Sequence, residues 1–399
     1  MQRQTCGEIL RRCAPQNDTP QNHLDAVLDA RRAAHGEPPR VWVLTSKKLG
    51  DNAQVLAIAD ALGWPYEIKR LEFTGLNHFH FRVFGPSLGK VAVDRSAPLV
   101  PPWPDLVLTI GRRSTPVALW IRRQSGGRTK LVQVGQSRVG FDCFDLVVAN
   151  PHYHLPARAN VLRLNLPLLY GNTAAIAAAA TAWQPRFADL PRPWTALLVG
   201  GSTAPFTLDA QVARRMMEEI KQVVRHASGS LLVTTSRRTA RDVADVIEAG
   251  MPANGFFYRW TPDGQSNPYL GILGLADRFI VTGESISMLV EVVRQGKPLA
   301  IYPLPSRTKS ARLWYRHTLQ RLFFPLVHGS LRPRTWRESL GDRLVHWGLL
   351  EYRRDFSLFH RQLVQRGLAV HLGAPFPPVQ PPPPDELPAV IERITALFA

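Results

Sequence analysis

Short apolar runs alternate with segments of helical spacing along most of the chain. In the first half, each run ends at a polar or glycine-containing turn, where the next amphipathic segment begins. The runs that we expect to form strands are Val41–Leu44, Tyr66–Leu71, Leu106–Ile110, Leu131–Val134 and Leu146–Ala149. Short, mostly apolar strands separated by helices are typical of a parallel sheet covered on both faces. The pattern therefore predicts a Rossmann-like α/β domain over residues 39–183.

The alternation begins again after a proline-containing linker, Trp183–Trp194. The second half predicts strands at Ala196–Val199, Leu231–Thr234, Phe256–Tyr258, Arg278–Val281 and Lys297–Tyr302. We expect helices at Asp209–Ala227, Arg238–Glu248, Tyr269–Leu275 and Ser285–Gln295. The sequence thus predicts two tandem doubly wound α/β domains that face a cleft, the second over residues 195–310. Ligands bind at the carboxyl ends of the strands in such sheets.

The two ends of the chain do not follow this alternation. Residues 1–38 lack the apolar core of a signal peptide, and we expect a poorly ordered lead-in there. Residues 311–399 predict a basic helical segment and a proline-rich run, Pro375–Pro384. No apolar run reaches the ~18–20 residues that a membrane-spanning helix needs. Three cysteines provide no disulfide framework, so we expect a cytoplasmic protein.

The formal net charge of +18 is unevenly distributed. A GC-rich genome, whose codons favour arginine, is the simplest explanation of the total. Between Ser306 and Arg366, however, 13 Lys or Arg stand against 4 Asp or Glu, and Trp314, Trp336 and Trp347 lie among them. Such a segment suits an anionic membrane surface, with the protein peripheral at the inner membrane, or a phosphorylated substrate. Charge alone also allows nucleic acid, but no recognised nucleic-acid module accompanies it.

The segment Thr282–Glu291 predicts a strand end, a turn at Gly283 and a helix start. The positive end of a helix at such a junction attracts an anion. Glu284, Ser287 and Glu291 are spaced to share one helix face, and Glu291 lies roughly 6 Å beyond the first turn. That spacing suits a phosphate at the helix start and a ribose on Glu291. Alternatively, the serines are N-caps and Glu291 is solvated. The candidate ligands are Gly283, Glu284, Ser285, Ser287, Met288 and Glu291.

Three more loops at the same end of the second sheet could bind a nucleotide. A glycine loop allows the backbone to approach a phosphate, and neighbouring hydroxyls add donors. Hydroxyls followed by two arginines, in Thr234–Arg238, also suit a phosphate. The Asn-Pro-Tyr segment before a helix could hold a base or sugar. Each loop could instead be a tight turn or a helix cap. The candidates are Gly200, Gly201, Ser202, Thr203, Ser236, Arg237 and Asn267.

Three polar loops follow strands of the first predicted sheet and could bind an anionic acceptor. They offer cationic and amide side chains, although any one of them could provide capping alone. The acceptor-binding candidates are Ser46, Lys47, Gly50, Gln54, Gly111, Arg112, Arg113 and Gln136. Asp51 contributes the only carboxylate of these loops, so it is the candidate for the general base that deprotonates an acceptor hydroxyl.

Several familiar sites are absent from the sequence. No GxGxxG follows a strand and no Tyr-x-x-x-Lys occurs, which argues against a dehydrogenase or a short-chain epimerase. The sequence also lacks a GxxxxGK[ST] phosphate loop, a DxD motif for a metal-bound nucleotide sugar and a GxSxG elbow. His152 and His154 have no acidic partner nearby, so we expect no metal site. We expect no tightly bound cofactor, with a nucleotide diphosphate sugar as the substrate.

Six segments in a fixed order resemble one protein family. The segments SKKLGDNAQ, TIGRRS, GGST, TTSRRT, NPY and TGESISMLVE lie within Val41–Pro305. Together they resemble the bacterial relatives of the plant mitochondrial-fission "elongated mitochondria" proteins. Glu284 stands where many members carry Asp, a change that keeps the charge. The resemblance implies a GT-B-like glycosyltransferase fold and, for the plant members, recruitment of a dynamin-related protein at the mitochondrial outer surface.

Similarity to lipid-linked GT-B transferases implies that Glu291 binds the ribose and that Gly201 and Ser202 bind the diphosphate. The leading hypothesis is a metal-independent glycosyltransferase, or a close relative, that binds a nucleotide diphosphate sugar and passes the sugar to an envelope or lipid-linked acceptor. Backbone amides, the helix dipole and Arg237 would stabilise the departing diphosphate. The alternative is a non-catalytic, membrane-peripheral interaction protein with the same fold.

Overall fold

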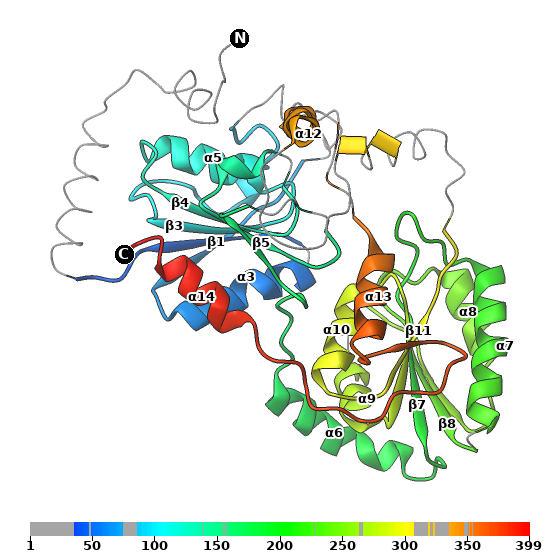
Figure 1. Ribbon diagram of the computed structural model, residues 1–399. Helices are drawn as coiled ribbons and strands as arrows, with labels where there is room; N and C mark the ends of the chain where they lie inside the picture. Colours follow the sequence, from blue (N-terminus) through cyan, green and yellow to red (C-terminus); the bar gives the residue numbers. More distant parts are fainter. Residues whose placement is uncertain are drawn as a thin grey trace. The chain divides into compact units, whose positions relative to one another are not determined.

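The computed structural model describes residues 36–399 apart from 48, 75–85, 138, 154, 156–157, 227, 263–265, 307–317, 320–321, 324–334, 347–349, 351 and 353. The described chain forms two compact units, each built from more than one stretch of sequence (Figure 1). Unit 1 contains the chain up to Leu168, the described part of Tyr315–Arg354, and Asp385–Ala399. Unit 2 contains the described part of Leu169–Trp314 and Asp355–Pro384.

A parallel sheet forms the centre of unit 1, and among the described residues its strand order is β2-β1-β3-β4-β5-β6. The strands are β1 (Val41–Thr45), β2 (Tyr66–Arg70), β3 (Leu106–Ile110), β4 (Lys130–Val134), β5 (Leu146–Ala149) and β6 (Val161–Arg163). Successive residues of β1 enter different cores, with Trp42 and Leu44 in one and Val41 and Val43 in the other. The sheet is therefore buried on both faces, which is why its strands are apolar throughout.

Helices cover both faces of this sheet (Figure 1). The elements between and beyond the strands are α3 (Leu49–Leu62), η1 (Val93–Arg95), α5 (Thr115–Gln124), η2 (Phe141–Cys143), α12 (Trp336–His346) and α14 (Leu387–Thr395). Although α14 lies at the end of the sequence, it packs against α3 through Val390 and Ile394. The Glu386 carboxylate fastens it further by accepting from the backbone N–H groups of Asn165 and Leu166 at 2.9–3.0 Å.

Unit 2 repeats the architecture, with the order β12-β11-β10-β7-β8-β9 among its described strands. The strands are β7 (Trp194–Leu198), β8 (Ser230–Thr234), β9 (Gly255–Tyr258), β10 (Arg278–Thr282), β11 (Leu299–Tyr302) and β12 (Val370–His371). The helices are α6 (Thr173–Phe187), α7 (Ala210–His226), α8 (Arg241–Ala249), α9 (Tyr269–Leu275), α10 (Ile286–Arg294) and α13 (Phe356–Gln365). Helices α7 and α8 lie on one face of the sheet, and α9, α10 and α13 lie on the other (Figure 1).

The predicted fold class is confirmed, because the chain forms two Rossmann-like α/β units with parallel sheets. The domain boundaries differ from the predicted ones. Residues 169–183 belong to unit 2, since α6 packs on α9, where Gly271 and Gly274 leave room for Trp183 and Ala180. The predicted segment 311–399 is divided between the units rather than separate. Strands β6 and β12 were not predicted, because two or three residues at a sheet edge carry little periodic signal.

Two expectations concern features outside the sheets. The predicted lead-in, residues 1–38, lies outside the described residues except for 36–38. Among the described residues, no helix is both long enough and apolar enough to cross a bilayer.

Cys143 is disulfide-bonded. The count of three cysteines does not predict this pairing, and it weakens the argument for a reducing compartment.

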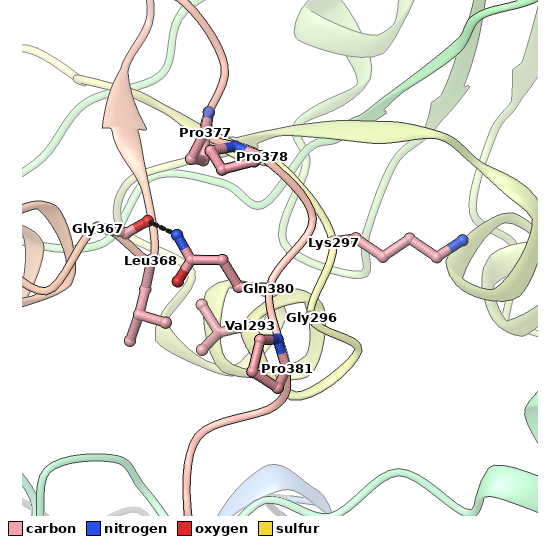
Figure 2. Close-up of a pocket in the computed structure, with 9 residues that line it drawn as sticks. All are labelled: Val293, Gly296, Lys297, Gly367, Leu368, Pro377, Pro378, Gln380 and Pro381. Carbon is pink, nitrogen blue, oxygen red and sulfur yellow. Dashed lines mark hydrogen bonds between the residues drawn. The ribbon is translucent and has the colours of Figure 1, made fainter.

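The proline-rich run of unit 2 is held against the end of α10 (Figure 2). Gln380 donates from its backbone N–H to the Gly296 carbonyl at 3.1 Å and from Nε2 to the Gly367 carbonyl at 2.9 Å. Gly296 has φ +66°, and a Cβ there would lie 2.1 Å from the Gln380 carbonyl oxygen. The enclosed space is about 10 Å³, the volume of a single water-sized probe. This pocket is therefore a packing defect rather than a ligand site.

We predict that Gly271→Ala destabilises the protein by about 1–3 kcal/mol through overpacking. A Cβ at this position of α9 would lie 2.7–2.8 Å from three side-chain atoms of Trp183. Gly50→Ala in α3 is the matched control, because a Cβ there meets nothing within 4 Å and only helix propensity changes. Urea unfolding measures both variants, and a Gly271→Ala protein as stable as wild type would contradict this account of the α6–α9 contact.

Candidate functional sites at the two switch points

Both sheets reverse their direction of growth at a point that open α/β sheets use for ligand binding. In unit 1 the chain passes from β1 to β2 on one side and then returns to β3 on the other. In unit 2 it passes from β7 to β8 and β9, and then returns to β10 on the other side of β7. The loops that leave the two strands diverge at such a switch point and open a crevice at their carboxyl ends. The β1 and β3 loops and the β7 and β10 loops are therefore the loops expected to contact a ligand.

A pocket of about 250 Å³ lies at the switch point of unit 1. It brings together two of the three loops that the sequence predicted for an acceptor. Its lining residues are Leu44, Thr45, Ser46, Lys47, Asp51, Leu71, Phe73, Ile110, Gly111, Arg112, Arg113 and Ser114. Five of the predicted acceptor residues and the predicted base, Asp51, thus line one cavity.

Hydrogen bonds within each loop fix the walls of this pocket. The Asn52 side chain forms two hydrogen bonds with the Ser46 backbone. Its Oδ1 accepts from the Ser46 N–H at 3.0 Å, and its Nδ2 donates to the Ser46 carbonyl at 2.6 Å. Gly111 has φ +78°, a conformation that favours glycine. Its carbonyl accepts from Thr115 Oγ1 at 3.2 Å, and Ser114 Oγ donates to the Ile110 carbonyl at 2.6 Å. The β3 loop is therefore held by hydrogen bonds to its own backbone carbonyls.

Side chains of both charges line the pocket, and Tyr153, which is not one of its lining residues, interacts electrostatically with two of them, Asp51 and Arg112. Lys47 pairs with Glu72 at 3.2 Å, although Lys47 is 70% exposed. Burial raises the pKa of the Tyr153 hydroxyl. The cations Arg354 and Arg112 oppose this shift, and the Asp51 carboxylate adds to it. Tyr153 is thus within electrostatic reach of Asp51. The sequence reasoning missed this residue, because the PHYHLP segment was considered only for its histidines.

Three predicted acceptor residues lie outside the pocket lining. Gln54 is buried, and its Oε1 accepts from Asn150 Nδ2 at 3.0 Å. Gln136 is also buried and donates from Nε2 to the Tyr352 carbonyl at 2.8 Å. Gly50 is an exposed residue of α3. The two glutamines connect parts of unit 1, so the third predicted loop has a packing role in this structure.

In unit 2, the glycine loop after β7 packs directly on its neighbours. The Gly200 N–H donates to Thr282 Oγ1 at 2.9 Å, and the Gly201 N–H donates to Glu284 Oε1 at 2.6 Å. A Cβ on Gly200 would lie 1.9 Å from Glu284 Oε1, and one on Gly201 would lie 2.1 Å from the Arg238 carbonyl oxygen. Both positions therefore need glycine for protein packing, and the Gly201 amide already has an anionic partner.

Glu284 is the buried centre of this loop cluster. Its side chain is fully buried, and among the described residues its Oε2 has no hydrogen-bond partner. Burial raises the pKa of Glu284, against the opposing effect of the Gly201 N–H. Helix α10 begins at Ile286. Glu284 therefore precedes the helix, and the predicted polar stripe of Glu284, Ser287 and Glu291 is reduced to its two helical members, both partly buried.

Arg238, the neighbour of the predicted Arg237, reaches the other loops. Its guanidinium donates to Thr203 Oγ1, lies 3.4 Å from Ser285 Oγ and lies 3.9 Å from Glu284 Oε1. Arg237 is exposed. The orientation follows from a turn in which Thr239 Oγ1 accepts from the Ser236 N–H at 2.9 Å and donates to the Gly200 carbonyl at 2.5 Å. Spacing alone could not distinguish two adjacent arginines.

The first turn of α10 has no acidic side chain, and its N-cap residue Ser285 makes no side-chain capping bond. The helix start therefore keeps amide donors that an anion can use. The Arg238 guanidinium beside Ser285 adds a full positive charge. Ser202, by contrast, is engaged internally, because its Oγ donates to the Leu208 carbonyl at 3.1 Å and accepts from its N–H at 3.0 Å.

Glu291 has a tyrosine partner that sequence reasoning did not foresee. Tyr269 Oη donates to Glu291 Oε2. Burial raises the pKa of Tyr269 well above its ordinary value, and the Glu291 carboxylate raises it further. Burial likewise raises the pKa of Glu291, which the Tyr269 hydrogen bond opposes. Asn267 Oδ1 accepts from the Tyr269 N–H at 3.0 Å, so the Asn-Pro-Tyr segment positions Tyr269 against Glu291.

Comparison with known proteins decides the family. A model of the family described as "Mitochondrial fission ELM1" matches residues 50–323. The chain belongs to the mitochondrial fission ELM1 family. It is 25% identical over 300 residues to an uncharacterized protein of Rickettsia prowazekii, with 67% of this chain and 84% of that protein covered. It is 27% identical over 238 residues to the mitochondrial fission protein ELM1 of Arabidopsis thaliana, and this match spans 54% of each protein.

Solved structures with a similar fold include a UDP-GlcNAc 2-epimerase from Methanocaldococcus jannaschii. Its TM-score is 0.44 at 9% sequence identity, over 90% of this chain and 99% of that one. Within the described residues of this ELM1-family protein, no group of three His, Cys, Asp or Glu side chains could hold a metal ion.

We predict that the raised pKa of Glu284 makes stability depend on pH. The folded carboxyl holds its proton more tightly than an unfolded one, whose ordinary pKa is 4.5. The folded state therefore binds more protons in the window above 4.5, and this contribution makes stability fall as pH rises through it. Urea unfolding at a series of pH values should show Glu284→Gln gaining stability relative to wild type across that window. Glu392→Gln, at an exposed site of α14, is the control, and parallel profiles for wild type and Glu284→Gln would refute the assignment.

Proposed function

We propose that this ELM1-family protein binds a nucleotide diphosphate sugar at the switch point of unit 2 and transfers the sugar to an acceptor bound in the unit 1 pocket. The observation that carries the proposal is the pairing of the Arg238 guanidinium with the uncapped start of α10. Guanidinium groups and helix starts both bind phosphate groups well. A diphosphate would lie there, outside the loop cluster centred on Glu284.

The ribose has a candidate ligand farther along the same helix. Glu291 is one and a half turns beyond Ile286, roughly 8 Å of axial rise. Because Tyr269 donates to Oε2, the Oε1 atom is the one that would accept a ribose hydroxyl. The base would lie beyond the ribose, and Asn267, which is exposed at the start of α9, is a candidate for contacting it.

The proposed transfer needs a base for the acceptor and charge stabilisation for the leaving group. Asp51 would accept the proton of an acceptor hydroxyl as its oxygen bonds to the anomeric carbon of the sugar. The bond between that carbon and the diphosphate oxygen breaks, and the released diphosphate keeps the electron pair. Arg238 and the α10 amides would stabilise the charge that develops there. Arg112 and Arg113 suit an acceptor that is itself phosphorylated.

The rival function is a non-catalytic, membrane-peripheral interaction protein. It rests on the basic segment 306–366, of which Trp314 and Trp347 lie outside the described residues. Within the described part of this segment, helix α12 carries an exposed tryptophan, Trp336.

Nucleotide binding should appear as a thermal shift with one class of nucleotide among UDP, GDP, CMP and ADP sugars. A ligand at 100 times its Kd adds about 2.7 kcal/mol, enough to raise the Tm by roughly 5 °C. Glu291→Gln keeps the shape of the side chain and should weaken binding about tenfold. Asp51→Asn, in unit 1, should keep the full shift. No response to any nucleotide, or the same response in Glu291→Gln, would count against the proposal.

The adjacent arginines provide a matched pair of variants. Arg238→Ala should lower the affinity for a nucleoside diphosphate about 10- to 100-fold, the effect of losing a charged hydrogen bond. Arg237→Ala removes the same charge one residue away and should change the affinity less than about threefold. Isothermal titration calorimetry measures both. A larger loss in Arg237→Ala than in Arg238→Ala would place the diphosphate elsewhere.

A further inference from the structure

Among the α12 side chains whose exposure is described, the exposed ones are all apolar or cationic. These exposed residues are Trp336, Arg337, Leu340 and Arg343. At 100° per residue, these four positions fall within roughly 120° of the helix circumference. Trp336 is 71% exposed and is one of the most exposed large apolar side chains among the described residues. A tryptophan in water at this level loses most of the free energy that burial would give it.

The opposite side of α12 fixes the helix to unit 1, so the exposed face has a defined orientation. Val345 is buried in a core of that unit. Asp342 is also buried, where it accepts from Tyr352 Oη at 2.7 Å and pairs with Arg158. Among the described residues, these contacts lie on the side of the helix away from Trp336, which is exposed.

Both carboxylates of α12 are engaged within the protein, so the exposed face carries positive charge without an acidic side chain. Asp342 is turned into unit 1. Glu338 Oε2 accepts from the Thr335 N–H at 2.9 Å and from Thr335 Oγ1 at 3.1 Å, while Thr335 Oγ1 accepts from the Glu338 N–H at 3.2 Å. This reciprocal cap keeps Glu338 at the helix start. The Arg337 guanidinium lies over the Trp336 ring at 5.5 Å.

We propose that the face formed by Trp336, Arg337, Leu340 and Arg343 binds the surface of an anionic lipid bilayer. An indole ring and a leucine side chain enter the boundary between headgroups and acyl chains, and arginines beside them reach the lipid phosphates. The net charge of +18 adds attraction at longer range. The helix has 11 residues, a length of roughly 16 Å, so it lies along the surface.

The chemistry of this face favours lipid over nucleic acid. A phosphodiester backbone offers charge to the two arginines, but it has no apolar layer for Leu340 and Trp336. A bilayer interface offers both, with the apolar layer directly below the phosphates. The proposal is independent of nucleotide binding in unit 2, and it also gives the rival function a specific surface.

Vesicle co-sedimentation with the full chain tests the proposal. The probes are vesicles of phosphatidylcholine alone and vesicles that also contain phosphatidylglycerol. Wild type should sediment with the anionic vesicles, and less so as salt increases. The variant Trp336→Ala/Arg343→Ala should bind the anionic vesicles roughly 50-fold more weakly. Loss of one cation lowers the affinity about fivefold, and loss of one large apolar side chain lowers it about tenfold.

A matched variant in the same unit controls for charge and hydrophobicity. Val93 and Arg95 of η1 are each 62% exposed, and Val93→Ala/Arg95→Ala removes the same charge and one exposed apolar side chain. It should bind vesicles as wild type does, and thermal unfolding should show both variants folded. Undiminished binding by the α12 variant, no binding by wild type, or equal binding to neutral vesicles would overturn the proposal. The proposal would also be overturned if wild type bound duplex DNA but not vesicles, and if the α12 variant lost that DNA binding.

Discussion

The Glu284 carboxylate, buried among three loops, determines how the carboxyl end of the unit 2 sheet is built. It accepts from the Gly201 N–H and leaves no room for a side chain at Gly200. Because Gly201 in turn packs on the backbone of Arg238, the β7, β8 and β10 loops are fixed relative to one another. The position of the Arg238 guanidinium at the start of α10 follows from this packing. Burying a carboxylate with an oxygen that has no hydrogen-bond partner among the described residues lowers the stability of the fold. The Gly201 N–H and the Arg238 guanidinium, which lie in two of the loops, offset part of this loss.

The two units share a topology but fill their switch points differently. In unit 1, the loops after β1 and β3 line an open pocket that contains Asp51 and several cations. In unit 2, the equivalent loops close on Glu284, whose carboxyl group occupies the space beside the glycine amides. The proposed diphosphate would therefore lie outside the Glu284 cluster, beside Arg238 and the first turn of α10. The same parallel-sheet geometry thus provides a cavity in unit 1 and a closely packed loop cluster in unit 2.

The sequence predicted the loops of both sites more accurately than the roles of individual residues in them. Apolar strands followed by polar turns located the β1, β3, β7, β8 and β10 loops, because topology places such loops at the carboxyl ends of the strands. Local spacing could not separate Arg238 from Arg237, since both are exposed and the turn held by Thr239 determines which guanidinium reaches the neighbouring loops. Nor could it pair Tyr269 with Glu291, which are distant in sequence and meet only when α9 packs beside α10.

By itself, the sequence determined the fold class, the two parallel sheets and the positions of most strands and helices. It did so because burial on both faces imposes an apolar pattern that local reading detects. Only the tertiary structure decided that α14 joins unit 1 and α6 joins unit 2. It also decided that Gln54 and Gln136 are buried and hydrogen-bonded within unit 1, that Glu284 lies inside the loop cluster, and that Asp342 of α12 is buried while Trp336 is exposed. These outcomes depend on contacts between residues far apart in the chain, and no local pattern encodes them.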